Sequence, residues 1–132
     1  MEKSTHLRTP IKRARGLGSA HSGTGHFWLQ RLSALALIPL SMWFMVVLLT
    51  RLIHADAASI GQWLHHPLVA LAMAALMVAL FVHARLGIQT IIEDYVHNHA
   101  KKIVALLMLN IFTLGLGGAS LMAIIKLHFV GI

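Results

Sequence analysis

The residue best suited to a chemical role is His83, which lies well inside a long apolar run from Leu68 to Ile92. An imidazole at membrane depth is costly and rare, so by default it marks a functional position. Its ring nitrogens can ligate a metal or exchange hydrogen bonds with a neighbouring helix. Two interpretations stay open at this point: ligation, or a hydrogen bond to a polar group on another helix.

Small residues accompany this imidazole along one face of the predicted helix. Their spacing of three or four residues gives the series Ala72, Ala75, Ala79, His83 and Gly87. Small side chains allow another helix or a flat ligand to approach closely, and Gly87 leaves room for a planar macrocycle one turn from His83. Asp94 lies on the same face, about 16 Å from His83 along the helix axis, so a site there would lie at the membrane edge.

An acid–phenol pair, Asp94 and Tyr95, closes this segment. A tyrosine at the interface is often only part of the aromatic belt. Beside Asp94, the phenol of Tyr95 is also suited to donate a hydrogen bond to a quinone carbonyl, with the carboxylate or nearby water supplying protons.

Two arginines need partners at or within the membrane. Arg85 is displaced about 200° around the helix from His83, so it faces away from that imidazole. At this depth it must pair with a neighbouring helix or subunit, snorkel, or meet an anionic ligand. Arg31 lies at the edge of the first apolar run. It fits a snorkelling anchor or a binding residue for an anionic group such as a propionate.

Other polar and small residues favour structural roles. The pairs His65-His66 and His97-x-His99 lie in predicted loops without carboxylate or thiolate partners at metal-binding spacing, so we predict no metal site there. The glycines from Gly115 to Gly118 predict close helix packing, and Asn110 is suited to a hydrogen bond across helices. Trp43 lies in the middle of a predicted span, where it packs against a neighbour or lipid.

The elements that must position these residues are transmembrane helices. The chain has 132 residues, of which 58% are hydrophobic, and a soluble domain of this length could not hide that much apolar surface. We predict an all-α membrane protein with a basic N-terminal tail over 1–27 and a three-helix transmembrane domain over 28–132. The spans run from about 28–53, 67–92 and 103–127, each long enough for roughly 30 Å of hydrocarbon. Pro67 suits the first position of the second helix.

The basic residues predict orientation. The net charge is +7, and most of the Lys and Arg residues lie in the tail and between the second and third spans: Lys3, Arg8, Lys12, Arg13, Arg15, Lys101 and Lys102. Such residues set topology and contact anionic lipid, so we predict a cytoplasmic N-terminus and no nucleic-acid partner. We expect no cleaved secretory signal, because the tail lacks a short apolar core. The chain contains no cysteine, which excludes disulfides and thiolate-held metal centres within it.

Two stretches resemble the succinate:quinone oxidoreductase family, specifically its hydrophobic membrane-anchor subunits. They are Ser22 to Ala34, entering the first span, and His83 to His97, which contains the His-x10-Asp-Tyr motif. The length and three-span layout agree, so the resemblance covers roughly 16–132.

The resemblance implies a non-catalytic anchor subunit of succinate dehydrogenase in a bacterial cytoplasmic membrane. It implies a haem b shared with a second three-span cytochrome b anchor subunit, with His83 as one axial ligand and Arg31 near the propionates. It further implies that Tyr95 and Asp94 belong to a ubiquinone site, and that flavoprotein and iron–sulfur subunits dock on the cytoplasmic face. Because His83 alone among ten histidines lies deep in a predicted span, a six-coordinate haem would need a second ligand from a partner.

Three alternatives remain open at the level of sequence. One is a fumarate reductase anchor, which runs the reaction in the opposite direction. Another is a small proton-coupled transporter with His83, Arg85 and Asp94 as its relay, although no inverted repeat or broken helix is visible. The third is a structural assembly subunit with a packed, unliganded histidine.

Overall fold

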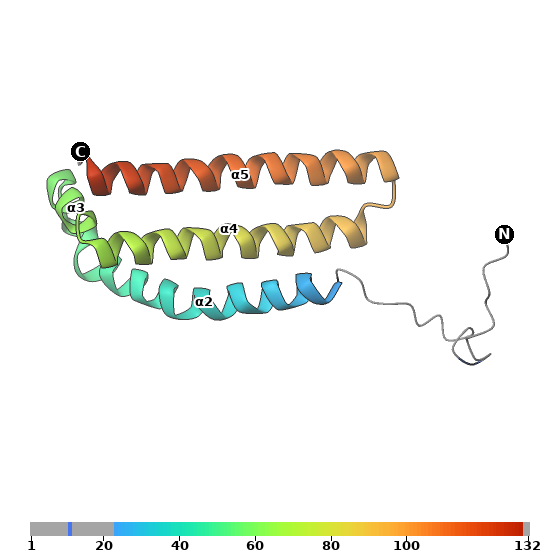
Figure 1. The fold of residues 1–132 in the computed structure, drawn as a ribbon, viewed down its shortest axis with the longest axis horizontal. Coiled ribbons are helices and arrows are strands. Elements are labelled where there is room, and N and C mark those ends of the chain that lie inside the picture. Colours follow the sequence, from blue (N-terminus) through green and yellow to red (C-terminus); the bar gives the residue numbers. More distant parts are fainter. Residues whose placement is uncertain (1–10, 12–22, 131–132) are drawn as a thin grey trace, which may run out of the picture.

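Three long antiparallel helices form a single layer (Figure 1). The structure, a computed structural model, describes residue 11 and residues 23–130. In chain order its elements are α2 (Gly23–Thr50), η2 (Leu52–His54), α3 (Ala57–Leu64), α4 (Pro67–Tyr95) and α5 (His99–Phe129). All regular elements in the described part of the chain are helices. Three of these helices are long and apolar enough to cross a membrane. The predicted all-α fold with three spans is therefore confirmed.

The helix ends differ from the predicted span ends. The first helix begins at Gly23, not near Trp28, and the third begins at His99, not near Ile103. A helix satisfies its own backbone groups, so it can continue from the hydrocarbon into the interface without cost. The Asn98 side chain caps α5 by accepting a hydrogen bond from the Lys101 N–H at 3.1 Å. The predicted N-terminal tail over 1–27 is thus helical from Gly23 onward. Residues 1–10 and 12–22 of this tail lie outside the described residues.

Helix α4 lies between α2 and α5 and packs against both (Figure 1). Its buried residues are alanines and leucines: Ala70, Leu76, Ala79 and Leu86. Pro67 stands at its first turn, as predicted. Because a single layer has two open faces, most large apolar side chains of the three helices stay exposed. These faces suit lipid or another membrane subunit.

A short amphipathic helix, α3, closes the end of the layer where α2 and α5 finish. The Asp56 side chain caps it by accepting a hydrogen bond from the Ser59 N–H at 3.0 Å. Hydrogen bonds from the side chain and the backbone of Ser59 lower the pKa of the exposed Asp56 carboxyl below its ordinary value of 3.8. The ring of Trp63 stacks on Trp43 of α2 at a centroid distance of 6.0 Å. The prediction that Trp43 packs against a neighbour is therefore confirmed, and α3 itself was not predicted.

One glycine of the third span makes the close packing that its sequence predicts. A Cβ added at Gly117 would lie 3.3 Å from the Phe81 ring of α4. Added at Gly115 or Gly118, it would meet nothing within 4 Å. Close contact between α4 and α5 is thus confirmed at Gly117, and the two other glycines face open space.

Candidate functional site

His83 lies in the middle part of α4 and is directed at α2. Its Nδ1 lies 3.2 Å from the hydroxyl oxygen of Ser33, which is 7% exposed and is the buried polar side chain of the described residues. The Ser33 hydroxyl also donates to the Gln30 carbonyl oxygen at 2.9 Å. One of the two predicted alternatives, a hydrogen bond across helices, is therefore present at Nδ1. It leaves the second ring nitrogen, Nε2, for ligation.

An apolar groove of about 510 Å³ runs beside this contact, between α2 and α4. Its lining contains Ser33 and otherwise apolar side chains: Leu29, Ala36, Leu40, Leu71, Ala74, Ala75, Val78, Ala79 and Val82. Ala75 and Ala79 belong to the small-residue face predicted to carry His83. Further along this face, a Cβ added at Gly87 would meet nothing within 4 Å. Packing between the described helices therefore does not explain the glycine, and its position is open to a group from outside them.

Arg85 finds its partner on the opposite side of α4. Its Nε donates a hydrogen bond to the Asn110 Oδ1 of α5 at 2.8 Å. The predicted cross-helix role of Asn110 is confirmed, and the partner of Arg85 is a neutral amide. His83 and Arg85 thus bond to different helices, which does not support the relay required by the transporter alternative.

Arg31 lies on α2, two residues before Ser33. Its Cζ stands 5.2 Å from the centroid of the Phe27 ring one turn earlier, a cation–π distance. The side chain is exposed, so its guanidinium remains accessible to an anionic group. This contact lies near the beginning of α2.

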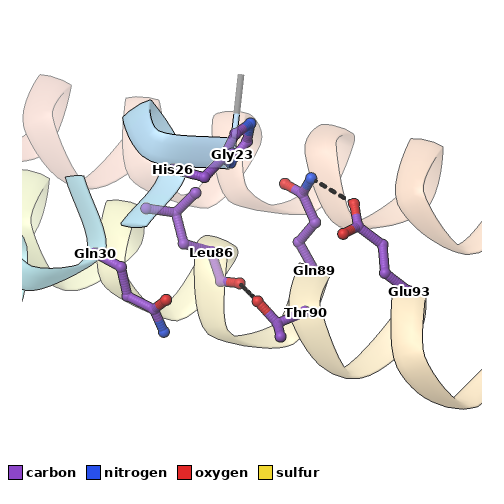
Figure 2. Close-up of a pocket in the computed structure, with 7 residues that line it drawn as sticks. All are labelled: Gly23, His26, Gln30, Leu86, Gln89, Thr90 and Glu93. Carbon is purple, nitrogen blue, oxygen red and sulfur yellow. Dashed lines mark hydrogen bonds between the residues drawn. The ribbon is translucent and has the colours of Figure 1, made fainter. Parts of the chain in front are cut away.

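A polar pocket of about 330 Å³ lies between the beginning of α2 and the last turns of α4 (Figure 2). His26 and Gln30 come from α2, and Gln89, Thr90 and Glu93 come from α4. Inside the pocket, the Gln89 amide donates to the Glu93 carboxylate at 2.8 Å. The sequence analysis did not predict this pocket.

The sequence carried a weak signal for this pocket. His26 and Gln30 are four residues apart, as are Gln89 and Glu93, so each pair shares a helix face. Facing polar pairs at two helix ends can create a hydrated entrance, but the sequence does not say that the two pairs meet.

Asp94 and Tyr95 form the last residues of α4, at the same end as the polar pocket. Both side chains are exposed, and Tyr95 is 77% exposed. The Tyr95 carbonyl oxygen accepts a hydrogen bond from His97 Nδ1 at 3.1 Å. The Lys102 ammonium donates to the Glu93 carbonyl oxygen at 2.8 Å. These bonds close the end of α4 and leave the phenol and carboxylate available to a group outside the chain.

Two histidines at the other end of the layer join α3 to α5. His65 Nδ1 donates to the His128 carbonyl oxygen at 2.7 Å, and His128 Nδ1 donates to the Leu64 carbonyl oxygen at 3.0 Å. Within the described ranges, no group of three or more His, Asp or Glu side chains is arranged to hold a metal ion. A single imidazole such as His83 does not form a group of this kind, so this finding does not bear on it.

Comparison with known proteins gives the family. Residues 5–117 match the model of the succinate dehydrogenase/fumarate reductase transmembrane subunit. This match covers most of the chain. The chain belongs to this family.

Similarity to individual proteins supports this family assignment. The chain is 37% identical over 94 residues to the succinate dehydrogenase hydrophobic membrane anchor subunit of Paracoccus denitrificans, covering 71% of this chain and 72% of that protein. It is 29% identical over 108 residues to the protein of the same name from Rickettsia bellii, covering 82% and 86%. Arg31, His83, Asp94 and Tyr95 all lie within the matched family region.

Proposed function

We propose that this chain is the hydrophobic membrane anchor of a succinate dehydrogenase. It attaches the catalytic subunits to a bacterial cytoplasmic membrane, helps to bind haem b and forms part of the ubiquinone-reduction site. The family match, the names of its relatives and the three long apolar helices support the anchor role. The chain itself carries out no succinate oxidation.

The observation that carries the haem proposal is the setting of His83. Its imidazole lies within a membrane helix, its Nδ1 is occupied by Ser33, and an apolar groove runs alongside. A bound haem would supply one-electron redox chemistry. His83 would offer Nε2 as an axial ligand, Arg31 would compensate propionate charge, and Gly87 would leave room for the ring edge. The second axial ligand would come from a second three-span anchor subunit, for which an open face of the helix layer provides space.

The quinone proposal rests on the exposed end of α4. The Tyr95 hydroxyl would donate a hydrogen bond to a ubiquinone carbonyl oxygen. Asp94, next to it, would tune the electrostatic potential or pass protons from water. The positive residues near this end favour its placement at the cytoplasmic face, where flavoprotein and iron–sulfur subunits would dock.

An absorbance spectrum of the purified complex tests this proposal. We expect a reduced b-type haem band in the wild-type complex, and loss or alteration of that band in His83→Ala. Membrane insertion of the variant should persist, since the change removes a polar side chain from an apolar helix. An unchanged haem band and potential in His83→Ala would contradict ligation. Because the family includes fumarate reductase anchors, the potentials of haem and quinone would separate the two directions of reaction.

A further inference from the structure

The hydrogen-bond donors and acceptors around Ser33 determine which ring nitrogen of His83 carries the proton. A serine hydroxyl has one proton to donate and two lone pairs to accept with. The Gln30 carbonyl oxygen, 2.9 Å away, can only accept, so it receives the hydroxyl proton of Ser33. The remaining contact, 3.2 Å to His83 Nδ1, must then run from a ring N–H to the serine oxygen. In the neutral form of the ring, Nδ1 then carries the proton and Nε2 keeps its lone pair.

The surroundings hold this arrangement in place. Ser33 is 7% exposed, so water has little access to its oxygen. A ring N–H buried in apolar surroundings without an acceptor would cost free energy. The Ser33 oxygen supplies that acceptor. The hydrogen bond also connects α2 to α4 at the edge of the apolar groove, so the rotation of the imidazole is set by the packing of these two helices.

We propose that Ser33 is a positioning residue for the haem ligand. Its hydroxyl selects the Nδ1–H tautomer of His83 and orients the ring, so that Nε2 would be free to ligate a haem iron. This inference rests on the proposed haem-binding function. Histidines that ligate metals usually donate their other ring N–H to an acceptor, which orients the ring and raises its basicity as a ligand.

The proposal sets the direction of a measurable change. A more basic imidazole favours the more positive ferric iron over ferrous iron, so the Ser33 hydrogen bond lowers the haem midpoint potential. Loss of such an outer partner typically weakens metal affinity by about 10–100-fold. If a tenfold loss falls on the ferric state alone, the midpoint potential rises by about 59 mV for one electron.

The experiment compares Ser33→Ala, which removes the hydroxyl, with Ser33→Thr, which keeps it. Ser41→Ala is the matched control, because Ser41 also lies on α2 and donates to the carbonyl oxygen three residues earlier, of Ile38. Each variant is purified as the assembled complex. Haem content, the haem midpoint potential and the electron paramagnetic resonance spectrum of the ferric haem are then measured. His83→Ala is prepared in parallel.

We expect Ser33→Ala to raise the potential and shift the resonance spectrum, or to lose haem, while Ser33→Thr and Ser41→Ala stay close to wild type. A wild-type potential in Ser33→Ala would overturn the inference. Equal changes, or equal loss of assembly, in Ser33→Ala and Ser33→Thr would also overturn it, because packing rather than the hydroxyl would then matter. Failure of the haem proposal is a separate result: His83→Ala would keep a wild-type haem.

Discussion

The hydrogen bond between Arg85 and Asn110 offers a sharp test of how the layer is held together. Arg85 Nε donates to Asn110 Oδ1 at 2.8 Å, joining α4 to α5. Arg85 lies ten residues before the end of α4, or about 15 Å along the axis, too far for easy snorkelling to the headgroups at that end. Changing Asn110 to Leu would leave the guanidinium without this acceptor.

The size of the effect follows from the kind of bond. A hydrogen bond to a charged group contributes about 1.5–3 kcal/mol in proteins, while polar contacts between membrane helices average about 0.6 kcal/mol. We therefore expect a coupling free energy of about 1–2 kcal/mol between Arg85 and Asn110. In a double-mutant cycle, Asn110→Leu should destabilise the chain more when Arg85 is present than in the Arg85→Leu background.

The assay is reversible unfolding of the full chain in lipid bilayer discs, for wild type, both single variants and the double variant. The coupling free energy is the difference between the double change and the sum of the single changes. Effects that add within about 0.3 kcal/mol would refute the reasoning, because independent sites behave in that way.

Further predictions concern packing, quinone reduction and pH. Gly117→Val should destabilise the α4–α5 contact by about 1–3 kcal/mol, because its Cβ would crowd the Phe81 ring; Gly115→Val, which faces open space, is the control, and equal unfolding free energies would contradict this. Tyr95→Phe should impair ubiquinone reduction more than reduction of a soluble artificial acceptor by succinate, and an equal loss of both activities would count against a quinone site. The cap of α3 by Asp56 should be present at neutral pH and weaken as pH falls below the ordinary value of 3.8, since the folded pKa is lowered. Hydrogen exchange of the first-turn amides of α3 measures this, and exchange with the same pH dependence in Asp56→Asn would disprove the role of the carboxylate charge.

The three spans could be predicted because composition and length alone determine them. A run of apolar residues long enough for the bilayer has to be helical, and Pro67 marked one start correctly. The ends beyond the hydrocarbon were harder to predict, since a helix such as α2 continues to Gly23 through residues that also suit an irregular tail. The short helix α3 depends on the Asp56 cap and on stacking between Trp43 and Trp63, which are distant in the sequence.

The sequence singled out His83 and Tyr95 as candidates, but it gave neither the Ser33 contact nor the polar pocket. His83 stood out because its type conflicts with its apolar surroundings, and Tyr95 because it ends the same helix. The contact between His83 and Ser33 joins residues 50 positions apart. It depends on which faces of α2 and α4 are turned toward each other. The polar pocket between the same helices depends on that rotation too. Hydrophobic pattern does not fix such rotations when both faces of a layer are apolar.

The most direct test of the central claim is a density map of the assembled complex at a resolution that shows side chains. The account predicts haem iron at bonding distance from Nε2 of His83, with Nδ1 directed at the Ser33 hydroxyl and the second axial ligand supplied by the partner anchor. A map in which His83 faces lipid, or in which both axial ligands come from other subunits, would contradict it.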